Sequence, residues 1–191
     1  ATVELLHRGY ICTIYDICLN KIVGTRVRNT DYDSTTISSS IRSLLKNSRI
    51  PASMLVGIHL IYPGVVDPIS GELGTSVAFV DSDIPDRHML IQLKKQFQDA
   101  EVMISTNGTI IAFEEFMHSQ SLPQLPLLSM NVDEAIFGGM VVSDTDSNMT
   151  FCYPLELGHL VIDMQGERCD ICGSRGCLES LCKTPRLFQA L

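Results

Sequence analysis

Apolar and polar positions recur along this chain with the periods of helices and strands. A helical pattern directly follows Ser34, with apolar residues at the i, i+4, i+7 and i+8 positions of one face. These residues are Ile37, Ile41, Leu44 and Leu45. Residues 54 to 62 form a nearly continuous apolar run that ends at the turn signal Pro63-Gly64. A run of that length is typical of a strand covered on both faces.

The same patterns predict the other elements of a mixed α/β sheet. Residues 9 to 27 are expected to form two strands with a turn near Asn20, and residues 67 to 75 a short hairpin with its bend at Gly71. Apolar spacing predicts helices around 90–97 and 108–118. Further strands are expected at 102–105, 127–131, 136–143 and into Tyr153. The order of these elements predicts a mixed sheet with helices on both faces.

Two domains are expected on either side of a proline-rich linker. Residues 121–126 contain Leu122-Pro123-Gln124-Leu125-Pro126, which is typical of a connection rather than of an element. We therefore assign residues 1–120 to a first lobe and 127–191 to a second.

Composition limits the functions that this chain can have. It has 191 residues, is 45% hydrophobic and carries a net charge of −8, with no basic cluster, so it is a poor nucleic-acid binder by itself. Its seven cysteines are an odd number, and several cluster in one motif, which favours a reducing cytoplasm over a disulfide framework. The sequence shows no signal-peptide pattern, and it has no run of about 18 apolar residues that would indicate a membrane-spanning helix.

Four metal-ligating side chains lie within 19 residues of each other near the end of the sequence. They are His159, Cys169, Cys172 and Cys177. Thiolate and imidazole together are a common ligand set for structural Zn²⁺. Gly173 and Gly176 allow the sharp turns that would bring Cys177 back towards the other two sulfurs. The alternative is that these are four unrelated buried side chains, since free cysteine is a common core residue.

This region resembles the zinc signature of the ROK family, which comprises sugar kinases and sugar-sensing transcriptional repressors. The family pattern is G-E-x-G-H followed by C-x-C-G-x-x-G-C-L-E. It is matched by Glu156-x-Gly158-His159 and by residues 169–179, although Leu155 replaces the first Gly and one residue is inserted between the first two cysteines. Residues 56–73 resemble a second family motif around Pro63-Gly64. The resemblance implies an actin-like, ribonuclease-H-like ATPase fold, with a partial second lobe that holds a zinc knuckle.

The resemblance also implies three catalytic parts, and this chain departs from each of them. Residues 16–20 stand for the phosphate turn D-x-G-G-T but keep only Asp16. Asn107 occupies the position of the aspartate that acts as general base, and an amide cannot accept a proton at neutral pH. Asp133, Glu134 and Phe137 lie in the segment aligned with the second phosphate loop, where carboxylates would repel triphosphate. We therefore expect no kinase activity.

The sugar-binding groups of the family are better preserved. By resemblance, Glu156 and Glu179 accept hydrogen bonds from sugar hydroxyls, and His159 ligates zinc close to the sugar. Asn107 can still hydrogen-bond a hydroxyl because an amide both donates and accepts. The alternative is that the two glutamates are exposed acids beside a structural zinc.

These observations lead us to expect the effector-sensing part of a ROK-type transcriptional regulator that binds a sugar or sugar phosphate. Two alternatives remain: a zinc-stabilised assembly module without a small-molecule ligand, and an ATP-dependent sugar kinase. The resemblance implies a homodimer or higher homo-oligomer, and contact with DNA only through a domain outside this chain. It also implies a longer second lobe and an N-terminal winged helix-turn-helix, so we expect either a fragment or a shortened family member.

Overall fold

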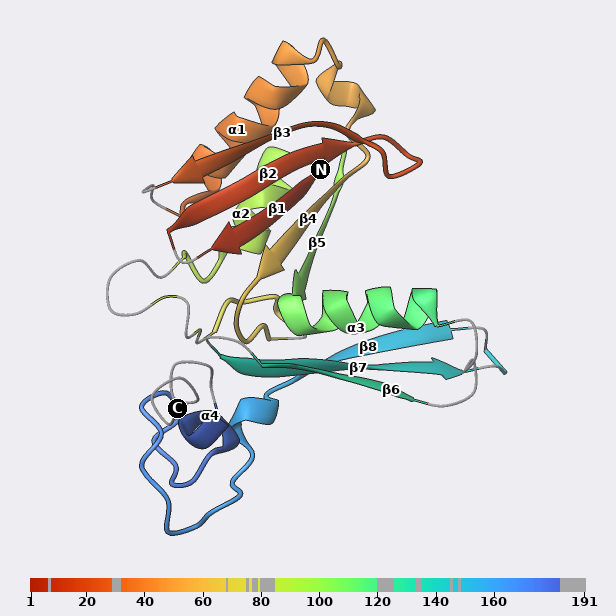
Figure 1. Cartoon of the computed structure of the whole chain (residues 1–191). Coiled ribbons are helices and arrows are strands. Elements are labelled where there is room, and N and C mark those ends of the chain that lie inside the picture. Colours follow the sequence, from red (N-terminus) through yellow and green to blue (C-terminus); the bar gives the residue numbers. More distant parts are fainter. Residues whose placement is uncertain are drawn as a thin grey trace. The chain divides into compact units, whose positions relative to one another are not determined.

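The computed structural model divides into two compact units, Ala1–Thr106 and Asn107–Leu191 (Figure 1). It describes residues 1–6, 8–28, 32–67, 69–74, 76, 79, 85–119, 126–132, 135–144, 146–147 and 149–182. The boundary between the units differs from the expected lobe boundary, because helix 107–118 belongs to the second unit. The predicted linker lies outside the described residues except for Pro126. None of the described helices is long and apolar enough to cross a membrane.

The first unit contains a mixed five-stranded sheet in the order β3-β2-β1-β4-β5. The strands are β1 (Thr2–Leu6), β2 (Gly9–Tyr15), β3 (Lys21–Arg28), β4 (Gly57–Tyr62) and β5 (Glu101–Thr106). The strands β1, β2 and β3 pair antiparallel, whereas β4 pairs parallel with both β1 and β5. The mixed sheet is confirmed, and the sequence analysis missed only β1 among its strands.

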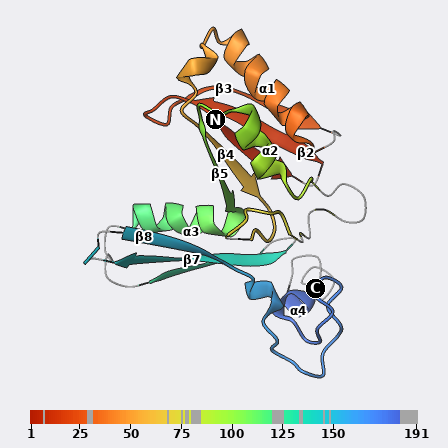
Figure 2. The same cartoon turned by 180° about the vertical axis from the view of Figure 1, so that it is seen from behind.

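Helices α1 (Ser34–Asn47) and α2 (Met89–Gln96) contact each other and cover the same face of this sheet (Figure 2). The expectation of helices on both faces is therefore wrong for the described part of this unit. Burial alternates along β4, where Ile58, Leu60 and Tyr62 are buried and the residues between them are only partly covered. The long apolar run that ends at Tyr62 thus forms a strand with one fully covered face.

Helix α1 begins where the sequence predicts because Asp33 caps it. The Asp33 carboxylate accepts hydrogen bonds from the backbone N–H groups of Thr35 and Thr36, each at 2.8 Å. Such caps satisfy N–H groups that have no partner within the helix. All four apolar residues predicted for its inner face are buried, namely Ile37, Ile41, Leu44 and Leu45.

The segment after β4 forms a turn rather than a full hairpin. Val66 and Leu73 make an isolated antiparallel bridge, and the Gly71 N–H donates to the Asp67 carbonyl. Thr75, at the predicted end of this hairpin, lies outside the described residues. Before β4, a short 3-10 helix (Ala52–Met54) follows Pro51.

The second unit is built on a three-stranded antiparallel sheet in the order β6-β7-β8. Its strands are β6 (Leu127–Val132), β7 (Ile136–Asp144) and β8 (Met149–Leu155), as predicted within a few residues. Helix α3 (Asn107–His118) packs across all three strands (Figure 1). After β8 come a short 3-10 helix, η2 (Leu157–His159), and then an extended loop that leads to α4 (Leu178–Cys182).

Helix α3 and strand β7 approach each other backbone to backbone at three glycines. A methyl group placed on Gly108 would overlap the carbonyl oxygen of Gly138, and one placed on Gly139 would overlap that of Gly108. A methyl group on Gly139 would also come within 2.9 Å of the Ala112 side chain of α3. Only glycine allows this contact, which fixes the first turn of α3 on the sheet.

We expect Gly108→Ala to destabilise the second unit by about 1–3 kcal/mol or more, because the backbone that meets the new methyl group cannot move aside as a flexible side chain would. Urea unfolding followed by circular dichroism measures the change. Gly57→Ala is the matched control, since a methyl group there meets only the Glu101 carbonyl at 3.4 Å. Equal midpoints for the two variants would contradict the contact.

Candidate metal centre

The loop between η2 and α4 is held closed by its own backbone. The Ile162 N–H donates to the Gly176 carbonyl at 2.8 Å, and the Leu178 N–H donates to the Leu160 carbonyl at 2.9 Å. Val161 and Cys177 also form a bridge. These bonds bring Cys177 next to His159, although the two residues are 18 positions apart.

A tight turn presents the first two cysteines on one side. The Cys169 N–H donates to the Ser174 carbonyl at 2.7 Å, and the Gly173 N–H donates to the Cys169 carbonyl at 2.9 Å. Gly173 has a φ of +76° and Gly176 a φ of +68°, the left-handed region that glycine favours. A side chain on Gly176 would also overlap the Asp163 carbonyl. Both glycines therefore do what the sequence analysis expected of them.

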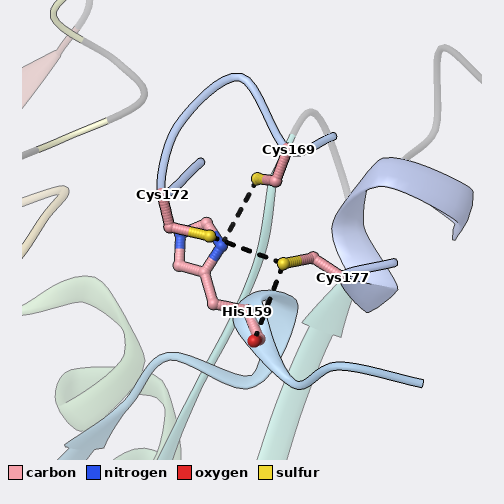
Figure 3. A group of neighbouring side chains, drawn as sticks. All are labelled: His159, Cys169, Cys172 and Cys177. Atoms are coloured by element: carbon pink, nitrogen blue, oxygen red, sulfur yellow. Dashed lines mark hydrogen bonds between the residues drawn. The ribbon is translucent and has the colours of Figure 1, made fainter. Parts of the chain in front are cut away.

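The four predicted ligands converge in the structure (Figure 3). One ligand atom from each of His159, Cys169, Cys172 and Cys177 lies within 4.8 Å of all the others. Cys169 Sγ lies 3.8 Å from His159 Nδ1, and Cys172 Sγ lies 3.5 Å from Cys177 Sγ. A tetrahedral zinc–thiolate site with bonds of about 2.3 Å has sulfur–sulfur separations of about 3.8 Å. The cluster could therefore hold a metal ion.

The cluster has one open side and one buried side. Cys169 and Cys177 are buried, His159 is half-buried and Cys172 is exposed. Hydrogen bonds from the backbone and hydroxyl of Ser174 lower the pKa of the Cys172 thiol to about 6. Burial raises the pKa of the Cys177 thiol to about 12. Ser174 was not recognised from the sequence, where only its place next to the turn glycine sets it apart.

Glu179 connects this loop to the sheet. Its side chain is buried, and its Oε2 accepts a hydrogen bond from the backbone N–H of Ile136, the first residue of β7, at 3.0 Å. Gly158 of η2 lies against the same carboxylate, since a methyl group there would come within 2.7 Å of Oε2. One of the two expected sugar acceptors is thus already engaged with the backbone, and Ile136 is a partner that the sequence analysis missed.

The other expected sugar-binding residues lie in the same unit. Glu156 is exposed and immediately precedes η2, which contains His159. Asn107 is the first residue of α3, next to the Gly108 contact with β7. Its Oδ1 is buried and has no hydrogen-bond partner among the described residues.

The structure describes the whole segment that stands for the first phosphate turn, but only part of the segment aligned with the second phosphate loop. Residues 16–20 form the turn between β2 and β3, where Asp16 accepts hydrogen bonds from the N–H groups of Cys18 at 2.9 Å and Asn20 at 2.8 Å. Asp133 and Glu134 lie outside the described residues. Phe137, by contrast, lies within β7 and pairs with Asn131 of β6.

A family model described as the ROK family matches residues 11–190. The chain belongs to the ROK family. Kanosamine kinase of Amycolatopsis mediterranei (strain S699) is 31% identical over 97 residues, which is 51% of this chain and 31% of that kinase.

Two solved ROK structures show the same fold. A transcriptional regulator, homologous to the E. coli MLC protein, matches with a TM-score of 0.77 at 17% identity over 98% of this chain. The ROK hexokinase from Thermus thermophilus matches with a TM-score of 0.71 at 18% identity, also over 98%. This chain therefore has the ROK actin-like ATPase fold with its mixed α/β sheet. It spans 47% of that regulator and 61% of that hexokinase.

We expect the purified ROK chain to contain one metal ion, because four converging donors form a closed structural site. Elemental analysis of protein prepared without chelators measures it. Cys177→Ser should abolish metal binding, whereas Cys152→Ser, which changes an exposed cysteine outside the cluster, should keep it. Metal-free wild-type protein with an intact fold would overturn the assignment.

Proposed function

We propose that this chain is the effector-sensing part of a ROK-type transcriptional regulator that binds a sugar or sugar phosphate and does not phosphorylate it. The observation that carries the proposal is Asn107 at the start of α3, which by resemblance stands for the family's catalytic aspartate. DNA would be contacted only through a domain outside this chain. The protein would act in the reducing cytoplasm, which its seven cysteines, an odd number, favour.

Asn107 has the chemistry of a binding group and lacks that of a base. A carboxylate can take the proton from an attacking hydroxyl, whereas a neutral amide cannot. Its Oδ1 is buried without a partner among the described residues, and such an acceptor is destabilising until a donor reaches it. A sugar hydroxyl is a suitable donor.

The first phosphate turn supports the loss of kinase activity. Its Cys18 and Asn20 N–H groups point at the Asp16 carboxylate of the same turn. The Asn20 side chain, together with these N–H groups, holds the pKa of the Asp16 carboxyl below its usual value, so the carboxylate stays charged. Backbone amides that are already engaged by this carboxylate, in a turn that lacks the family's glycines, are not free to bind a phosphate.

We further propose that the metal is structural Zn²⁺. Three sulfurs and one imidazole nitrogen within 4.8 Å of one another match the donors that zinc prefers. All four protein ligands would be used, which leaves no position for a reacting water. The ion would fix the loop between η2 and α4, and with it Glu179, whose helix begins directly after Cys177.

A sugar kinase is the second candidate, because the curated relative with 31% identity is a kinase. That match covers about half of this chain, and the solved structures include both kinases and a regulator. The third reading, a zinc-stabilised assembly module without a ligand, rests on the occupied Glu179 carboxylate. Two measurements separate the three candidates.

We expect no sugar-dependent ADP release above background with glucose, N-acetylglucosamine, xylose, fructose or kanosamine. Asn107→Asp should remain inactive, because the Asp16 turn still lacks its glycines. A coupled assay measures turnover, with a ROK glucokinase as positive control. Turnover that is lost in Asn107→Ala would establish the kinase instead.

Calorimetry with the same sugars and their phosphates tests ligand binding. We expect Glu156→Gln to weaken binding about tenfold or more, since a hydrogen bond to a charged acceptor contributes about 1.5–3 kcal/mol. Glu115→Gln changes another exposed glutamate, on α3, and should bind like the wild type. If no sugar gives heat with the metal-loaded wild type, or all three proteins bind equally, the sensing role of this site is wrong.

A further inference from the structure

Two sulfurs of the candidate metal cluster lie close enough to react with each other. Cys172 Sγ and Cys177 Sγ are 3.5 Å apart (Figure 3). A disulfide joins its sulfurs at about 2.05 Å, so a shift of about 1.5 Å would bring these two to bonding distance. Cys169 Sγ, by contrast, lies 3.8 Å from the imidazole Nδ1 of His159. The geometry therefore favours Cys172 and Cys177 as the pair that forms a disulfide.

The two cysteines differ in their access to solvent. Cys172 is exposed, whereas Cys177 is fully buried. An oxidant from solution would therefore reach the Cys172 sulfur first, and the Cys177 sulfur would then meet a neighbour that is already oxidised. Redox-sensing cysteines commonly have this arrangement, in which an accessible sulfur lies next to a second cysteine that completes the disulfide.

The turn between the two cysteines can follow the movement that a disulfide requires. Residues 173–175 are exposed, and Gly173 has no side chain that would resist a change of its backbone angles. The Cys177 end is held, because the Gly176 N–H donates to the Glu167 carbonyl at 2.8 Å and the Leu178 N–H donates to the Leu160 carbonyl at 2.9 Å. The movement therefore falls on the exposed turn that carries Cys172.

We propose that Cys172 and Cys177 are a site of reversible oxidation by peroxides, and that their disulfide releases the metal ion. The Cys172 thiolate attacks one peroxide oxygen, which breaks the O–O bond and gives a sulfenic acid and hydroxide. The Cys177 thiolate then attacks the Cys172 sulfur, forms the S–S bond and expels a second hydroxide. The two thiolates lose two electrons in total, and the peroxide is reduced to two hydroxides, which become water when they are protonated.

The disulfide removes two of the four donors of the cluster. A cysteine binds a metal as its thiolate, and neither sulfur of a disulfide is a thiolate. His159 and Cys169 alone do not supply the four ligands of a structural zinc. This release step rests on the structural metal proposed above, whereas the disulfide needs only the two cysteines. Two molecules of a thiol reductant return both sulfurs to the reduced state by exchange and are themselves joined in a disulfide, so the ion can bind again.

Hydrogen peroxide added to the zinc-loaded chain tests the proposal, with a chromogenic chelator reporting released zinc and peptide mass spectrometry locating the disulfide. The wild type should lose about one ion per chain as the Cys172–Cys177 bond forms, and dithiothreitol with added zinc should reverse both changes. Cys152→Ser alters an exposed cysteine outside the cluster and should respond like the wild type. Cys172→His keeps four donors, in a Cys₂His₂ set, but removes the pair, so it should retain its ion at the same dose.

Thiols of Cys172 and Cys177 that stay free while the exposed Cys18 is oxidised would overturn the proposal. A disulfide that maps to Cys169, or a sulfinic acid at Cys172 without a disulfide, would overturn it as well. Release of the ion from Cys172→His as rapidly as from the wild type would show that the disulfide does not cause the release. A wild type that holds no metal but still forms the Cys172–Cys177 bond would refute the structural zinc and leave the oxidation site supported.

Discussion

The second unit depends on the hydrogen bond between the Glu179 carboxylate and the backbone N–H of Ile136. This bond joins two segments 43 residues apart and is buried. A buried charged acceptor with a fixed donor is strong, and removing it would leave a polar group unpaired. Through this bond, the position of the cysteine loop is tied to the first residue of β7. The His/Cys cluster and the α3–β7 contact therefore belong to one connected framework.

Strand β7 contacts both the segment that begins with Asn107 and the segment that carries the cysteine cluster. Gly108 rests on Gly138 and fixes the start of α3, while Gly158 lies against Glu179 and near Ile136. Glycines let these backbones approach more closely than any side chain would allow. The candidate sugar-binding groups are thus attached to a rigid scaffold, which suits a site that must report the presence of a ligand.

Much of this arrangement could be predicted from local pattern. The spacing of Ile37, Ile41 and Leu44 predicted α1, and the Cys-Gly-x-x-Gly-Cys spacing predicted a cluster that the structure brings together. Val3 and Leu5 alternate with the polar residues Thr2 and Glu4, and this strand pattern could have predicted β1. Local pattern could not show that α1 and α2 share one face, because that depends on how the chain crosses the sheet.

Long-range polar contacts were also beyond the sequence. Nothing local marks Ile136 as the partner of Glu179, because a backbone N–H has no identity in the sequence. The sequence also did not predict that α3 belongs to the second unit. The buried residues of this helix are Gly108, Thr109 and Ala112, which are small and give no strong apolar pattern.

The uneven burial of the cluster determines how an ion would come and go. Cys169 and Cys177 are buried, and Cys172 is the exposed candidate ligand at the turn. An ion would therefore exchange through the Cys172 side. The Cys172 thiolate would be the first ligand to dissociate from the ion and the last to bind it. The lifetime of the bound ion would then be governed by the opening of one short turn rather than by unfolding of the whole unit.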